Sequence, residues 1–139
     1  MTSTPLLLLA AALSIVPQTN VPFHRGPLRN SFASAAEDVI DTADTVQIHA
    51  DDTEFSAQMQ QVRTAYDRLK SMAEDQRETD VSQALNDMIF AISACHITAR
   101  GGDSTQQCEE QVNHARTRSM EAIEKHKTPG GWQDGAPKE

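Results

Sequence analysis

Apolar residues recur at intervals of three and four along four stretches of the chain, which is the spacing that gathers them on one face of an α-helix. The first stretch comprises Phe32, Ala36, Val39, Ala43, Val46 and Ala50. The second comprises Phe55, Met59, Val62, Tyr66, Leu69 and Met72. The third comprises Val81, Leu85, Met88, Ile92, Cys95 and Ala99, and the fourth comprises Cys108, Val112, Ala115, Ser119 and Ile123. We therefore expect four amphipathic helices and no strands.

Start and stop signals separate these stretches. Asp51 and Glu54 have the three-residue spacing of a capping box, and Thr79–Asp80 supply an N-cap for the third stretch. Gly101–Gly102 end the third stretch, as glycine commonly does past a helix C-terminus, and Asp103–Ser104 begin the fourth. Because the three connections are short, consecutive helices should run antiparallel. The sequence thus predicts an all-α, antiparallel up-down four-helix bundle.

The bundle is expected to span residues 31–128, between two ends of different composition. Residues 1–30 are interpreted as a signal peptide-like or disordered segment. The apolar run Leu6–Val16 has the length of a secretory h-region and is too short for a stable membrane span, although no Lys or Arg precedes it. Ala33–Ser34–Ala35 fits the small-x-small pattern of a cleavage site. Residues 129–139 are expected to form a flexible C-terminal tail.

The two cysteines, Cys95 and Cys108, each lie six residues from the nearer glycine of the Gly101–Gly102 turn. In an antiparallel helical hairpin, equal distances from the turn place two residues at the same height, and both cysteines fall on apolar faces. We expect an intrachain disulfide between the third and fourth helices, with two buried free thiols as the alternative. A disulfide and an export-like start together favour a secreted or periplasmic location.

Acidic residues outnumber basic ones by 20 to 12, which gives a formal net charge of −8. This balance argues against nucleic acid or an anionic membrane as the main partner. Aromatic residues make up 4 % of the chain, too few for a base-stacking nucleic-acid binder or a β-sandwich. From Glu37 to Glu54 the chain holds acids and no base. We interpret this run as a solvated helix face, with a contact for a basic partner or a weak calcium site as the alternatives.

Histidine and carboxylate residues should gather where the first and third connections of such a bundle meet. His49, His96 and Glu54 are the candidates for a divalent metal site made of two imidazoles and one carboxylate. The alternative is that these residues are helix caps and boundary positions. His126 near the end of the last helix is a candidate haem ligand, but the first helix has no methionine to pair with it. We therefore expect no cofactor.

Between Met88 and Ala99 no residue other than His96 can carry a charge, and apolar residues occur all around the predicted helix. Met88, Ile89, Phe90 and Ile97 are the candidate interaction surface, with a central core helix as the alternative reading. The chain also lacks a Gly-x-Ser-x-Gly motif, a phosphate-binding loop and a Cys-x-x-Cys pair.

These features predict a protein that is not an enzyme. We expect it to bind another protein or itself, in the manner of an inhibitor, immunity protein, chaperone or adaptor. The alternative function is that of a small metal- or haem-binding helical bundle.

Overall fold

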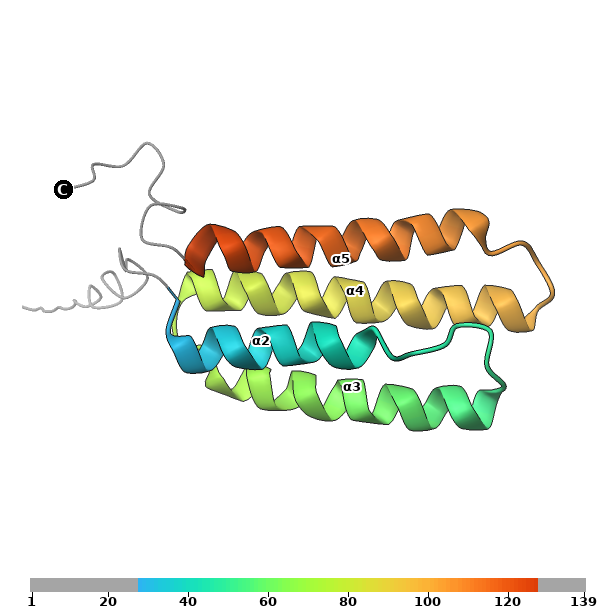
Figure 1. The fold of residues 1–139 in the computed structure, drawn as a ribbon, viewed down its shortest axis with the longest axis horizontal. Helices are drawn as coiled ribbons and strands as arrows, with labels where there is room; N and C mark the ends of the chain where they lie inside the picture. The colour runs from blue at the N-terminus through green and yellow to red at the C-terminus, as the bar shows by residue number, and fades with distance from the viewer. Residues whose placement is uncertain (1–27, 128–139) are drawn as a thin grey trace, which may run out of the picture.

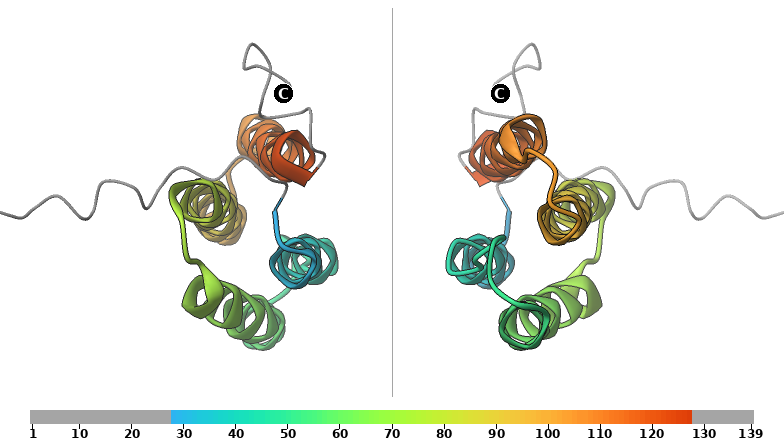
Figure 2. Two further views of the ribbon diagram at one scale, coloured as in Figure 1. Left: turned by 90° about the vertical axis from the view of Figure 1, so that its left-hand side faces the viewer. Right: turned by 90° about the vertical axis from the view of Figure 1, so that its right-hand side faces the viewer.

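Four α-helices lie side by side in the computed structural model, which describes residues 28–127 (Figure 1). They are α2 (Asn30–Ala43), α3 (Asp52–Met72), α4 (Gln76–Arg100) and α5 (Gln106–Lys127), and this part of the chain contains no strand. Seen end-on, the helices form a ring in chain order, so that each one packs against the next (Figure 2). The predicted all-α, up-down four-helix bundle is confirmed.

Each helix turns its predicted apolar face toward the middle of the ring. Among the most deeply buried side chains are Phe32, Val39, Val62, Leu69, Val81, Leu85, Met88 and Ile123. Helix α5 contributes fewer large side chains to this core than the other helices, since its buried residues are Ala115, Ser119 and Ile123. Burial of a large aliphatic side chain contributes about 1.5–3 kcal/mol, so apolar packing holds α5 less strongly than its neighbours.

Ion pairs join α5 to α2 at the surface. Arg116 donates to both carboxylate oxygens of Asp44, at 2.7 and 2.6 Å, and Lys127 donates to Glu37 at 2.7 Å. The hydrogen bond with Asp44 raises the pKa of Arg116 above its ordinary value. Each exposed pair stabilises the fold by at most about 1 kcal/mol. Part of the acidic run between residues 37 and 54 is therefore matched by bases of the same chain.

Aspartate residues cap the second and third helices of the ring. Asp51 caps α3 as predicted, because its carboxylate accepts a backbone N–H at 2.8 Å. Helix α4 begins at Gln76, so the predicted start at Thr79–Asp80 is wrong. The carboxylate of Asp75 accepts the backbone N–H of Glu78 at 2.9 Å. This earlier cap has the same three-residue spacing as a capping box and shortens the turn before α4.

Helix α2 is shorter than its apolar spacing suggested. It ends at Ala43, so the predicted continuation through Val46 and Ala50 is wrong. The chain turns after Ala43, and Val46, Ile48 and Ala50 pack, partly buried, against the core. The regular spacing of these residues therefore reflects a packed connection rather than further helical turns.

The packed body includes residues that precede the predicted boundary at residue 30. Leu28 is 2 % exposed, and its backbone N–H donates to the carbonyl of His126 at 2.7 Å. The apolar run Leu6–Val16 and the predicted tail 129–139 lie outside the described residues. None of the helices within residues 28–127 has both the length and the apolar character needed to cross a membrane.

Candidate functional site

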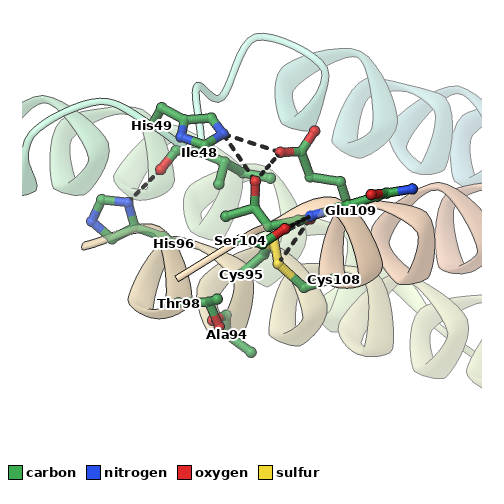
Figure 3. The surroundings of a disulfide bond; sticks show 11 residues. Ile48, His49, Ala94, Cys95, His96, Thr98, Ser104, Cys108 and Glu109 are labelled. Carbon is green, nitrogen blue, oxygen red and sulfur yellow. Dashed lines mark hydrogen bonds and ion pairs between the residues drawn. A yellow bond between two sulfur atoms is a disulfide. The ribbon is translucent and has the colours of Figure 1, made fainter. Parts of the chain in front are cut away.

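The predicted disulfide joins Cys95 of α4 to Cys108 of α5, with 5.3 Å between the Cα atoms (Figure 3). Helices α4 and α5 run antiparallel on either side of the Gly101–Gly102 turn (Figure 1). Gly102 has a φ of 86°, a left-handed conformation that glycine adopts without strain. The covalent bond therefore closes a tight hairpin and holds the start of α5 against the end of α4.

His96 ties three segments together next to this disulfide. Its Nδ1 lies 2.8 Å from the carbonyl oxygen of Ile48, and its Nε2 lies 2.9 Å from Oδ1 of Asp52 (Figure 3 shows the first contact). The ring stacks on Phe55 with 3.7 Å between centroids. Both ring nitrogens are therefore engaged by oxygen atoms of the same chain.

His49 lies on the same end of the bundle in a separate cluster (Figure 3). Its Nε2 is 3.0 Å from Oε2 of Glu109 and 3.2 Å from the hydroxyl of Thr105. The Thr105 hydroxyl donates to the same Glu109 oxygen, and this bond, followed by the one from His49, lowers the pKa of Glu109. A nucleophilic hydroxyl would instead donate to the imidazole, with the carboxylate on the other ring nitrogen. The cluster therefore joins the connection before α3 to the start of α5 and does not have the geometry of a nucleophile with its base.

The structure does not bring the three candidate metal ligands into one group. The Glu54 carboxylate accepts from Gln58 at 3.3 Å, while His49 and His96 bind Glu109 and Asp52. Across residues 28–127, no set of three or more His, Cys, Asp or Glu side chains is arranged to hold a metal ion.

The disulfide, the contacts of His96 and the cluster around His49 lie at one end of the bundle. We call this end the disulfide end.

The candidate haem ligand, His126, lies in the last turn of α5 at the opposite end of the bundle. Burial, and then the nearby charge of Lys125, lowers its pKa below the ordinary value of 6.5. The fold therefore disfavours protonation of this imidazole relative to the unfolded chain.

Near His126, a buried carboxylate organises what we call the Arg29 end. Glu78 is 1 % exposed, and Arg29 donates to its two oxygens at 3.0 and 2.8 Å. The backbone N–H of Glu74 adds a third hydrogen bond at 2.9 Å. The bond to Glu78 raises the pKa of Arg29 above its ordinary value. Sequence analysis missed this pair because its two members are 49 positions apart.

The candidate interaction surface divides between the core and the outside of α4. Met88 and Ile89 are 1 % and 6 % exposed, so their assignment to a surface is corrected: they belong to the core. Phe90 and Ile97 are 74 % and 71 % exposed. Ala94, which sequence analysis overlooked, is also exposed and lies between them at helical spacing. We call Phe90, Ala94 and Ile97 the outward face of α4.

The outward face could have been found from the helical period alone. The inner side of α4 is lined by Leu85, Met88, Ile92 and Cys95, and the outward residues fall about half a turn away from them.

Comparison with known proteins adds nothing to this assignment. No family description, no curated protein and no solved structure matches the chain.

Proposed function

We propose that this chain is an exported, non-enzymatic bundle that binds another protein through the outward face of α4. The observation that carries the proposal is the exposure of Phe90 and Ile97, two large apolar side chains one above the other on a helix. Burial of each would contribute about 1.5–3 kcal/mol to an association. Exposed apolar residues that gather on one face of a soluble domain often mark an interaction site.

The neighbourhood of these residues supports the same role. From residue 88 to residue 99 the only ionisable side chain other than the disulfide cysteines is that of His96, which is buried. Removing water from a charged group is the most costly part of burying a polar surface. A partner that docks on this face does not have to remove water from any charged group of α4 between residues 88 and 99. The surrounding helices give the face a rigid support, so little conformational entropy is lost when a partner binds.

A binding experiment tests this role directly. Wild-type protein and the variant F90S/I97S are immobilised and compared for the proteins that they retain from an extract of the source organism. We expect the wild type to retain a defined partner in stoichiometric amount and the variant to lose it, with unchanged circular dichroism. The variant M120S is the matched control, because Met120 is 41 % exposed but lies on α5. Equal retention by all three proteins would contradict the proposal.

Export is supported by the disulfide, since such bonds persist mainly in oxidising compartments. Fractionation of the source cells, with thiols alkylated before lysis, tests this part separately. We expect the protein outside the cytoplasm with both cysteines oxidised. A cytoplasmic protein with two alkylated thiols would rule out export.

A further inference from the structure

A groove of about 200 Å³ lies between α2 and α5, where the last helix of the ring meets the first (Figure 2). Its apolar lining comes from Ile40, Ile123 and Met120. The two isoleucines are buried, whereas Met120 is 41 % exposed. Within residues 28–127, Met120 is the third exposed large apolar side chain, besides Phe90 and Ile97. The outward face of α4 therefore does not account for all the apolar surface that the bundle leaves uncovered.

Charged side chains surround this apolar lining. They are Glu37 and Asp41 of α2 and Arg116 and Glu124 of α5. The two glutamates accept hydrogen bonds from Lys127, at 2.7 and 3.4 Å. The carboxylate of Asp41 is exposed and accepts no hydrogen bond from residues 28–127. The groove thus combines an apolar lining with one carboxylate that is available as an acceptor.

The volume of the groove suits a single large side chain. Pockets that hold whole small molecules usually have volumes of about 300–1,000 Å³, which exceeds this groove. An indole group combines a broad apolar ring system with one N–H donor and no acceptor. Such a group is complementary to an apolar lining with a carboxylate at its edge.

The chain itself supplies an indole group close to the groove. Its only tryptophan, Trp132, comes five residues after Lys127, the last described residue. Since Lys127 bridges Glu37 and Glu124, the chain leaves the described part of the fold at one end of the groove. The seven helical residues from Lys127 back to Met120 span about 10 Å, and five extended residues reach about 17 Å. A tail that reverses its direction can therefore place Trp132 beside Met120.

The sequence between Lys127 and Trp132 favours such a reversal. Pro129 cannot continue a helix, and Pro followed by Gly is typical of the central positions of a type II turn. Gly130 and Gly131 have access to left-handed conformations without steric cost. Residues 133–139 contain no large apolar side chain, so Trp132 is the residue of the tail that can fill the groove.

We propose that Trp132 docks in the groove between α2 and α5, with its ring against Met120 and its indole N–H donating to Asp41. The thioether of Met120 makes favourable contacts with an aromatic ring. A short tether keeps Trp132 at an effective concentration of about millimolar, so even a weak contact of this kind is populated. Docking there leaves the outward face of α4 uncovered and is independent of the partner proposed above.

Tryptophan fluorescence of the full chain tests the docking, because the emission comes from Trp132 alone. We expect the folded wild type to emit at a shorter wavelength than the urea-unfolded chain and to be quenched less by acrylamide. The variant M120E places a charge in the apolar lining and should move both readings to the values of the unfolded chain. The matched control Q111E adds the same charge at an exposed site on the opposite side of α5 and should behave like the wild type.

Nuclear magnetic resonance tests the two contacts of the ring. The chain gives one indole N–H resonance, and D41A should shift it toward its position in the unfolded chain. The control D38A removes an exposed carboxylate of α2 that does not line the groove and should leave the resonance in place. A nuclear Overhauser effect between the ring protons and the Met120 methyl group is expected in the wild type. This measurement needs no variant, so it decides the location even if M120E does not fold.

Circular dichroism shows whether each variant is folded. Wild-type emission equal to that of the unfolded chain would overturn the docking and leave the groove open to another occupant. Short-wavelength emission with no contact between the ring and Met120 would place Trp132 elsewhere and also overturn it. If the short-wavelength emission disappeared on dilution, the tryptophan of a second copy would fill the groove, and docking within one chain would be wrong. An indole N–H resonance that D41A does not move would overturn the hydrogen bond to Asp41.

Discussion

The two ends of the bundle are closed by different kinds of interaction. At the disulfide end, a covalent bond joins α4 to α5. Around it, the exposed side chains of His49 and Glu109 form hydrogen bonds with each other and with the buried Thr105. At the Arg29 end, a carboxylate that is 1 % exposed is held by a guanidinium group and a backbone N–H. The covalent bond holds the disulfide end together even where its side chains are hydrated. The Arg29 end is stable only while the buried carboxylate of Glu78 keeps its hydrogen-bond partners.

This difference predicts unequal tolerance of mutation. Exposed ion pairs contribute at most about 1 kcal/mol, and water replaces a lost partner. Removal of one member of a buried pair leaves an unpaired charge and costs about 3–5 kcal/mol. Substitutions at the Arg29 end should therefore damage the fold more than comparable ones among the exposed side chains of the disulfide end.

The largest effect is expected from truncation at the Arg29 end. Ala33–Ser34–Ala35, the candidate cleavage motif, lies inside α2, and a chain that starts at Ala36 lacks Leu28, Arg29 and Phe32. Phe32 is fully buried, and loss of a buried Phe side chain alone costs about 3–5 kcal/mol. Total stabilities of about 5–15 kcal/mol leave little after these losses, so we expect no cooperative unfolding transition.

A chain that starts at Leu28 is the control for this truncation, since it keeps every described residue. It should melt cooperatively, as the full chain does. Calorimetry of both truncated chains provides the measurement. A cooperative transition of normal enthalpy in the chain that starts at Ala36 would show that the Arg29 end is dispensable.

The next largest effect is expected for Arg29→Ala, which strands the buried carboxylate of Glu78. We expect a loss of about 3 kcal/mol in the free energy of unfolding, measured by urea denaturation. This is the lower end of the range for buried pairs, because the Arg29 side chain is 40 % exposed and the backbone N–H of Glu74 still binds the carboxylate. The double variant R29M/E78L replaces the pair with apolar side chains and should recover most of this loss. Arg68→Ala, at an exposed site on α3, should change stability by less than about 0.5 kcal/mol. Equal losses in the two single alanine variants would show that the pair with Glu78 contributes no more than an exposed arginine on α3.

The disulfide end should respond most strongly to loss of its covalent bond. The bond spans 13 positions, and closing a loop of this length contributes about 3 kcal/mol in the chain-entropy model. The double variant C95A/C108A should therefore melt roughly 12–24 °C lower than the oxidised wild type. Wild type reduced with dithiothreitol is the control and should melt close to the variant. An unchanged melting temperature would mean that hydrogen bonds alone hold this end.

The two ends also differ in how far the sequence predicted them. The disulfide followed from local symmetry, because both cysteines are equidistant from one glycine turn and lie on apolar faces. The pair of Arg29 and Glu78 joins the chain before the first helix to the start of the third, so its partners meet only after the helices have packed. Nothing in the local pattern of either residue indicates the other.

The same limit explains the errors within the helices. Apolar spacing of three and four predicted the inner faces correctly, but it also continued through Val46 and Ala50, where a packed connection mimics the pattern. In α4, the helical period separates Met88, on the inner side, from the exposed Phe90 and Ile97. Ile89 lies between the two sides, and its burial depends on where the neighbouring helices lie.

The smallest predicted effects concern how the free energy of unfolding depends on pH, which should differ between the two ends. The fold lowers the pKa of His126, mainly by burial and then by the charge of Lys125, while Asp80 and Asp75 oppose the shift. As the pH falls below about 6.5, the unfolded chain binds a proton before the folded one does, so the free energy of unfolding should decrease. The fold also lowers the pKa of Glu109, through its bonds with Thr105 and His49, so a second decrease should begin below about pH 4.5.

Single variants assign the two steps to the two ends. In urea denaturation over a pH series, His126→Gln should flatten the profile just below pH 6.5 and leave the acidic step in place. Glu109→Gln should reduce the step below pH 4.5 and leave the first one unchanged. If both variants altered the same pH range, the titrations would be coupled through the length of the bundle. Separate ranges would instead mean that each end senses protons through its own contacts, in keeping with the different ways in which the two ends are closed.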